Sequence, residues 1–122
     1  MTNNKILIID DENEIVALLA RVLRKQGYHV LESGNLIDGW KQLECTRPSL
    51  VFLDINLPDG NGLQVLPDIR KSYPRTQVIM ISAYDTLEDR NKATINGACN
   101  FLSKPFNLHQ VVSLVKALEH QA

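Results

Sequence analysis

The chain has 122 residues, enough for a single domain with one hydrophobic core. Apolar residues make up 44% and charged residues 22%, which is typical of a globular protein and argues against intrinsic disorder. The formal net charge of −1 predicts no general attraction to nucleic acid or to anionic membranes, and the apolar stretches are too short to cross a bilayer.

Five short runs along the chain have the composition of β-strands. The continuous apolar runs at residues 6–9, 50–53 and 78–81 predict central parallel strands, which are buried on both faces. The runs at residues 29–32 and 100–103 contain more polar residues, so we expect them at the edges of the sheet.

Helical patterns follow each of these runs. Apolar residues recur at helical spacing over residues 15–23, 36–43, 63–69 and 108–118. Pro67 lies inside the third pattern and fits only in the first turn of a helix. Residues 85–95 have few apolar residues and a possible capping box, Asp85 with Glu88, so we expect a weakly anchored helix there.

Five β-α units in succession predict a single α/β domain over residues 1–122. Such a chain forms a parallel five-stranded sheet with helices on both faces. The edge positions of the second and fifth strands agree with the strand order 2-1-3-4-5 of a flavodoxin-like (βα)5 fold.

Polar residues follow the predicted strands at the edge of the sheet where such folds bind ligands. Asp10 and Asp11 follow the first strand, Asp54 the third, Ser82 the fourth and Lys104 the fifth. Two carboxylates about 4 Å apart repel by roughly 4 kcal/mol at an effective dielectric constant of about 20. Lys104 offsets one of the three negative charges, and a divalent cation balances the rest. Because the donors are all oxygen, we expect Mg²⁺ rather than Zn²⁺.

Plainer interpretations exist for parts of this set. Asp11 with Glu14 has the spacing of a helix capping box. The segment at residues 59–62, Asp-Gly-Asn-Gly, is explained by a simple turn.

Taken together, the motifs resemble the response regulator receiver domain of two-component signalling, a CheY-like family. The resemblance covers essentially the whole chain. It rests on the acidic pair 10–11, the stretch 53–62, Ser82-Ala83 and the Lys-Pro-Phe motif at 104–106. Residues 82–88 and 104–106 are also similar to receivers attached to ATPase-type transcription activators.

The resemblance implies a role for each matching residue. Asp54 would accept a phosphoryl group from a phosphohistidine, and Lys104 would pair with a phosphoryl oxygen. Magnesium would be bound by Asp11, by Asp54 and by the backbone carbonyl of Asn56, with Asp10 acting through a water. The Lys104–Pro105 peptide bond would be cis.

The resemblance also implies a switch. After phosphorylation Ser82 would move to hydrogen-bond the phosphoryl group, and Phe101 would rotate into the space beneath the helix at 85–95. The surface of the fourth helix, fifth strand and fifth helix would then control an output domain or downstream protein, with a phosphorylation-dependent dimer as one outcome. We expect Tyr84 and Asn56 to set the lifetime of the phosphorylated state.

The implied partners are a histidine kinase or phosphotransfer protein, with no direct contact to nucleic acid or membrane by this domain. The protein would be a signalling phosphoacceptor rather than an enzyme, although it would assist its own phosphorylation and dephosphorylation. The absence of a signal-peptide pattern and of paired cysteines favours the cytoplasm.

Three alternatives remain at this point. A haloacid-dehalogenase-like phosphatase needs a second aspartate two positions after the nucleophile, where this chain has Asn56. A flavin-binding module needs a phosphate loop after the first strand, where this chain is acidic. The third alternative is a receiver-shaped interaction module that is never phosphorylated.

Overall fold

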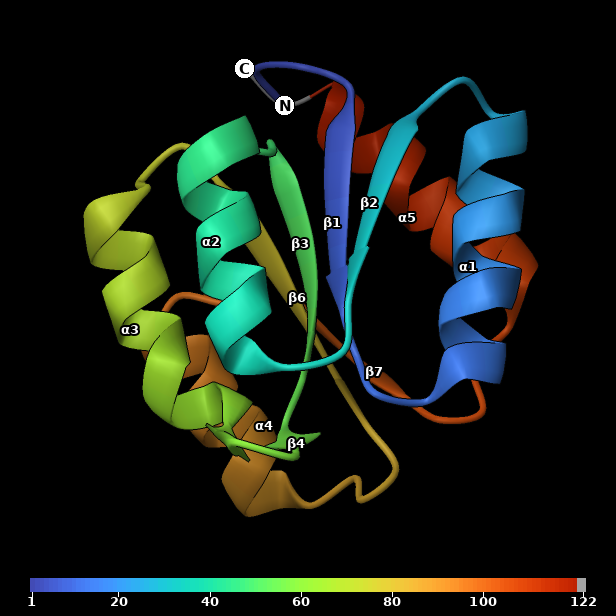
Figure 1. Ribbon diagram of the computed structural model, residues 1–122. Coiled ribbons are helices and arrows are strands. Elements are labelled where there is room, and N and C mark those ends of the chain that lie inside the picture. Colours follow the sequence, from blue (N-terminus) through green and yellow to red (C-terminus); the bar gives the residue numbers. More distant parts are fainter. Residues whose placement is uncertain (121–122) are drawn as a thin grey trace.

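The computed structural model describes residues 1–120, which form a parallel five-stranded sheet between two layers of helices (Figure 1). The strands are β1 (Lys5–Ile9), β2 (His29–Ser33), β3 (Leu50–Asp54), β6 (Gln77–Ser82) and β7 (Asn100–Ser103). Their order is β2-β1-β3-β6-β7, and each neighbouring pair is parallel. This confirms the predicted 2-1-3-4-5 order, with the two more polar strands at the edges.

The helices cover both faces of the sheet. They are α1 (Asn13–Lys25), α2 (Leu36–Thr46), α3 (Gly62–Ser72), α4 (Leu87–Ile95) and α5 (Leu108–Glu119). In Figure 1, α1 and α5 lie on one side of the sheet, and α2, α3 and α4 lie on the other.

Alternation along the strands divides the core into two clusters. In β1, Ile6 and Ile8 pack with the apolar residues of α1 and α5, whereas Leu7 and Ile9 pack with those of α2 and α3. All four side chains are buried, because successive residues of a strand point to opposite faces. The middle residues of the central strands are therefore all apolar, and the polar residues that can form a site come where these strands end.

A short hairpin between β3 and α3 is absent from the sequence-based prediction. Its strands are β4 (Asn56–Leu57) and β5 (Gly60–Asn61), which pair antiparallel across a two-residue turn. The simple turn expected at residues 59–62 overlaps the hairpin turn only at Asp59, because Gly60–Asn61 forms β5 and Gly62 begins α3.

The starts of two helices differ from the predicted capping boxes. At α1 the N-cap residue is Glu12, whose side chain makes no cap hydrogen bond, so Asp11 and Glu14 form no capping box. At α4 the N-cap is Thr86, whose side chain accepts a hydrogen bond from the Asp89 N–H. The Asp85 carboxylate instead accepts hydrogen bonds from Arg90 of α4 and Ser103 of β7.

Pro67 does not lie in the first turn of α3, contrary to expectation. The helix begins at Gly62, which places Pro67 in its second turn. The proline is exposed, so its ring lies in solvent and only one helical hydrogen bond is lost.

Helix α4 is weakly anchored, as its composition predicts. Its only buried residue is Ala93, while Leu87 and Ile95 are 74% and 82% exposed. No helix within residues 1–120 combines the length and the apolar character that crossing a membrane requires.

Candidate functional site

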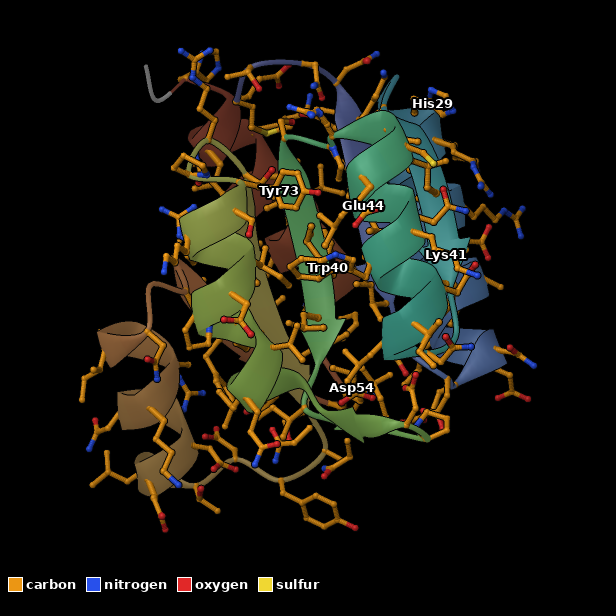
Figure 2. All side chains as sticks on the ribbon, turned by 60° about the vertical axis from the view of Figure 1, so that its left-hand side comes forward. His29, Trp40, Lys41, Glu44, Asp54 and Tyr73 are labelled. Carbon is orange, nitrogen blue, oxygen red and sulfur yellow. The ribbon has the colours of Figure 1, made fainter. Side chains whose placement is uncertain are left out.

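Two buried aspartates lie side by side at the carboxyl ends of the two central strands. Asp54 is the last residue of β3, and Asp10 follows β1 directly. Because Ile9 of β1 pairs with Leu53 of β3, the next residues of both strands are neighbours. Asp10 is only 1% exposed and Asp54 only 3%. Figure 2 shows Asp54 at the end of β3, next to the ribbon of the following hairpin.

Lys104 brings the positive charge to these carboxylates. It directly follows β7, and its backbone N–H donates to the carbonyl of Ser82 over 2.8 Å, which fixes where the side chain begins. Its Nζ lies 3.0 Å from Asp54 Oδ2 and 2.9 Å from Asp10 Oδ2. The Lys104–Pro105 bond is cis, as the family resemblance implied.

Glu12 completes the cluster, although the sequence analysis did not assign it a role. Its Oε1 lies 2.7 Å from Lys104 Nζ, and one carboxylate oxygen each of Asp10, Glu12 and Asp54 lies within 4.8 Å of the others. Asp11, which we expected in this place, is exposed and outside the cluster. Three acidic residues in a row were the available signal, but the sequence does not reveal which of them turns inward.

The charges of the cluster shift the pKa of its members. Burial and, to a lesser extent, the nearby Asp10 carboxylate raise the pKa of Asp54 while Lys104 lowers it, and together these effects bring it to about 6. For Lys104, burial disfavours the charged form, but its three carboxylate partners outweigh that effect and raise its pKa. At neutral pH the site therefore holds an ammonium group beside an Asp54 that is mainly ionised.

One carboxylate oxygen is incompletely satisfied. Asp10 Oδ1 accepts a hydrogen bond from the Glu12 N–H over 2.9 Å. Asp10 Oδ2 is buried and, among the described residues, has no partner with hydrogen-bond geometry, although Lys104 Nζ is within ion-pair distance. A buried carboxylate oxygen that lacks a hydrogen-bond donor is suited to bind a cation. Three carboxylates and one ammonium also leave two negative charges, the number that one divalent cation balances.

Asn56 lies where its backbone can face the cluster. It is exposed, two residues after Asp54, and its N–H donates to Asp54 Oδ1 over 3.3 Å. The carbonyl that the family resemblance assigns to metal binding therefore belongs to a residue in contact with the phosphoacceptor candidate.

Ser82 ends β6 in a locally closed arrangement. Its side chain is fully buried, and its hydroxyl both donates to the Tyr84 carbonyl and accepts from the Tyr84 N–H, each over 3.0 Å. Because the hydroxyl has a single hydrogen, donating it to a phosphoryl group on Asp54 requires the bond to the Tyr84 carbonyl to break. Tyr84 itself is 68% exposed.

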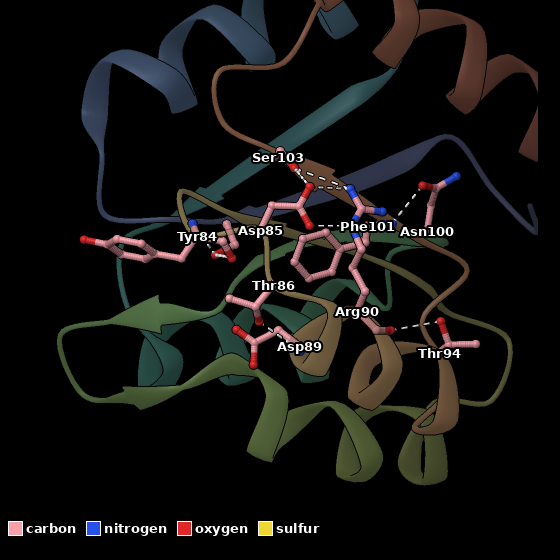
Figure 3. A network of polar contacts seen from close by, with 10 residues as sticks. Tyr84, Asp85, Thr86, Asp89, Arg90, Thr94, Asn100, Phe101 and Ser103 are labelled. Carbon is pink, nitrogen blue, oxygen red and sulfur yellow. Dashed lines mark hydrogen bonds and ion pairs between the residues drawn. The ribbon is translucent and has the colours of Figure 1, made fainter.

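Phe101 is buried beneath a polar clasp formed by Asp85, Arg90 and Ser103 (Figure 3). The Asp85 carboxylate makes a two-point ion pair with Arg90 of α4 and accepts a hydrogen bond from the Ser103 hydroxyl of β7. The Arg90 guanidinium carbon lies 4.8 Å from the centre of the Phe101 ring. The clasp thus joins the loop after Ser82, helix α4 and strand β7.

Comparison with known proteins identifies the family. Residues 6–116 match the model of the response regulator receiver domain. The chain belongs to this family. Its acidic cluster is typical of the phosphorylation site of two-component receivers, which interact with histidine kinases and output domains. Membership decides against the phosphatase and the flavin-binding alternatives.

Two curated relatives illustrate the similarity. The DNA-binding transcriptional regulator NtrC of Azospirillum brasilense is 35% identical over 116 residues, which cover 95% of this chain and 24% of the relative. The alkaline phosphatase synthesis transcriptional regulatory protein PhoP of Bacillus subtilis is 34% identical, over 95% of this chain and 48% of the relative. The chain therefore spans about a quarter of one relative and about half of the other.

Solved structures agree with this fold. A CheY-like receiver domain protein from Methanospirillum hungatei has a TM-score of 0.90 at 28% identity, covering 96% of this chain and 94% of its own. A response regulator protein from Burkholderia pseudomallei, with a phosphorylated aspartic acid and a calcium ion, has a TM-score of 0.85 at 25% identity, covering 97% and 74%. A beryllofluoride-activated NtrC4 receiver domain, which is a dimer, has a TM-score of 0.89 at 29% identity, covering 94% and 95%.

Proposed function

We propose that residues 1–122 form a phosphoacceptor receiver domain whose phosphorylated residue is Asp54. The observation that carries this proposal is the buried Asp54 carboxylate beside Asp10 and Glu12, with the Lys104 ammonium 3.0 Å away. The donor would be the phosphohistidine of a histidine kinase or phosphotransfer protein, and the domain would act in the cytoplasm.

Phosphoryl transfer to Asp54 requires one covalent step from the protein. An Asp54 carboxylate oxygen attacks phosphorus, a new P–O bond forms, and the P–N bond to the donor histidine breaks. The histidine nitrogen leaves with the electron pair and takes up a proton. Positioning and neutralisation of charge on the transferred group are the main requirements, and Lys104 meets part of the second.

The cluster fits a magnesium ion, because all of its donors are oxygen and Asp10 Oδ2 lacks a hydrogen-bond partner. We propose Asp54, Asp11 and the Asn56 carbonyl as direct ligands, with Asp10 acting through a water. Asp11 would have to turn inward, in the direction that Glu12 takes in this structure. Bound magnesium supplies positive charge to the equatorial phosphoryl oxygens and to the nucleophile.

The resulting acyl phosphate would act as a reversible signal. A phosphoryl group adds about two negative charges and three acceptor oxygens, to which the Ser82 hydroxyl can donate. Phe101 is already buried, so the expected rearrangement is a change in its packing under Arg90 rather than a burial from solvent. The face formed by α4, β7 and α5 would report this change to an output domain, a downstream protein or a second copy of the chain. The domain itself would contact neither nucleic acid nor membrane.

Intact-mass spectrometry after incubation with acetyl phosphate and Mg²⁺ tests this function. We expect the mass gain of one phosphoryl group, its loss in Asp54→Asn, and its loss when EDTA replaces Mg²⁺. No mass gain in the wild-type chain, combined with no response to beryllofluoride, would support the alternative of an interaction module that is never phosphorylated.

A further inference from the structure

The hairpin that follows Asp54 is fastened to a distant helix by Asp59, a residue that the sequence analysis assigned to a simple turn. Asp59 lies at the tip of the hairpin, between β4 and β5. Its Oδ1 accepts a hydrogen bond from the N–H of Leu36 over 2.8 Å, and its Oδ2 accepts one from Ile37 over 3.0 Å. These are the first two N–H groups of α2, which have no partners inside the helix.

The first turn of α2 is thus capped from two sides. Asn35, the N-cap residue, accepts from the Asp38 N–H over 2.7 Å and satisfies the helix locally. Asp59 satisfies the two preceding N–H groups from more than twenty residues away. The pKa of Asp59 is held below its usual range, chiefly by the Leu36 N–H, which indicates that the ionised carboxylate fits this place.

The hairpin also contacts α2 closely beside this cap. A Cβ at Gly60 would lie 2.8 Å from Leu36 Cδ1, and the φ of Gly60 is +157°, so another residue at this position would be both crowded and strained. Leu57 of the same hairpin is buried in the cluster against which Leu36 packs. The hairpin is therefore held at its tip by hydrogen bonds and along its side by close packing.

Helix α2 in turn is fixed to the strand that ends at Asp10. A Cβ at Gly39 would lie 2.6 Å from Ile9 Cδ1, so the absence of a side chain lets α2 approach β1. The Asp10 N–H donates to the Ser33 carbonyl over 2.9 Å, and the Ser33 hydroxyl donates to the Asn35 carbonyl over 3.0 Å.

These contacts link Asp10 and Asp54 through the start of α2 and the hairpin. One side runs from Asp10 through Ser33 and Asn35 to the start of α2, and the other runs from Asp54 along the hairpin. Asp59 is the polar link that joins the two sides. Asn56, whose carbonyl faces magnesium in the proposed function, lies on the hairpin between Asp54 and this link.

We propose that Asp59 is a positioning residue for the phosphorylation site, because it holds the hairpin that carries Asn56 at a fixed distance from Asp10. This inference rests on the proposed function, since it assigns the Asn56 carbonyl to the cation. Asp59 acts through the backbone and does not touch the reacting groups.

The test compares Asp59→Ala with Asn35→Ala, using the full chain and MgCl₂ as the probe. Both variants lose a cap of the same helix, so we expect similar decreases in melting temperature. Only Asp59→Ala releases the hairpin, so it alone should weaken Mg²⁺ binding, by roughly tenfold, as measured by NMR titration of the unphosphorylated protein. Hydrogen exchange at the Leu36 and Ile37 amides should also accelerate more in Asp59→Ala.

Asp59→Asn separates positioning from charge. Asparagine keeps one of the two acceptor oxygens that hold the Leu36 and Ile37 N–H groups, so Mg²⁺ affinity in Asp59→Asn should lie between those of wild type and Asp59→Ala. A lower Mg²⁺ affinity in Asp59→Asn than in Asp59→Ala would show that holding the hairpin is not what matters, and this would overturn the inference. Equal Mg²⁺ affinities of Asp59→Ala and Asn35→Ala would overturn it as well. If the wild-type chain bound no Mg²⁺, the proposed function would fail first and this inference with it.

Discussion

Asp54 carries a negative charge in a place that disfavours charge. Burial is the largest cause of its raised pKa, and the Asp10 carboxylate adds to it. A carboxyl whose pKa is about 6 in the folded chain and near 3.8 when unfolded stabilises the fold while it is protonated. That stabilisation is fully present below pH 3.8 and is lost as the pH rises through 6. The proposed phosphoacceptor is therefore maintained at a cost in stability, which a bound cation would offset.

Replacing Asp54 with a neutral residue should stabilise the protein without metal. In EDTA at pH 7, we expect Asp54→Asn to raise the free energy of unfolding by up to about 3 kcal/mol, since one pKa unit corresponds to about 1.4 kcal/mol. The gain should shrink as the pH falls toward 4, where wild-type Asp54 is itself protonated. Urea denaturation over this pH range measures the effect, and a gain that does not depend on pH would contradict the assignment.

Asp59 provides a control of opposite sign. Its pKa is lowered in the folded chain, so its charge contributes stability above the unfolded pKa, and that contribution is lost as the pH falls through the folded value. Asp59→Asn should therefore be less stable than wild type at pH 7, with a deficit that narrows in acid. Asp54→Asn and Asp59→Asn make the same chemical change, so the opposite signs of their stability effects would come from the surroundings of the two carboxylates.

Ser82 is the residue at which phosphorylation should first change the fold. Its hydroxyl donates to the Tyr84 carbonyl and must give up that bond to donate to a phosphoryl group on Asp54. Ser82→Ala should leave phosphorylation of Asp54 largely intact, cost about 1 kcal/mol of stability, and weaken the response of the partner. Ser82→Thr, which restores a hydroxyl, should recover that response. An undiminished partner response in Ser82→Ala would contradict the role of the hydroxyl.

At the scale of elements, α4 is the helix whose movement would disrupt the least buried packing. It buries one side chain and is tied to β7 mainly by the clasp of Asp85, Arg90 and Ser103. The ion pair of the clasp is 43% and 38% exposed, so its contribution to global stability is small, below about 1 kcal/mol. A contribution of that size is nevertheless enough to bias two local arrangements of similar energy.

Removing the clasp should favour the activated arrangement. Arg90→Ala is expected to lower global stability by less than about 1 kcal/mol and to tighten binding of beryllofluoride with Mg²⁺ about two- to fivefold. Lys92→Ala is the control, because it removes the exposed pair with Glu88 on the same helix without touching β7. NMR titration of both variants measures the effect. Equal changes in the two variants would show that any loosening of α4 suffices.

The elements were predictable because local patterns determine them. Continuous apolar runs identified the buried strands, and the residues that end them placed Asp54, Asp10 and Lys104 together, since parallel strands end at one edge. Features that depend on contacts between distant segments were not predictable. The inward turn of Glu12 depends on the loop between β1 and α1, and the role of Asp59 depends on the first turn of a helix that begins more than twenty residues earlier. The capping-box pattern at Asp85 was misleading because Arg90 and Ser103 compete for that carboxylate.

At the scale of the whole molecule, the site and the exposed apolar residues of α4 lie at the same edge of the sheet, through which we expect them to be coupled. Lys104 follows β7, the edge strand, and α4 precedes it in the chain. Under the proposed function, a change at Asp54 would therefore reach the face of α4, β7 and α5 through Lys104 and Ser82 without crossing the core. Ile95 and Leu87 are exposed on α4, as a surface that binds a partner in one state requires.

Activation should lead to self-association through this face. With Mg²⁺ and beryllofluoride, we expect the chain to sediment as a dimer, as the activated NtrC4 receiver domain is a dimer. In a symmetric dimer each substitution acts twice, so Ile95→Ser should weaken association by at least roughly tenfold. Ile37→Ser is the control, because Ile37 is similarly exposed, at 65%, but lies on α2. Sedimentation velocity that finds Ile37→Ser impaired and Ile95→Ser unaffected would place the interface on the α2 side. That result would also separate dimerisation from the coupling through Lys104 and Ser82, because α2 is reached from Asp54 through the hairpin that Asp59 holds.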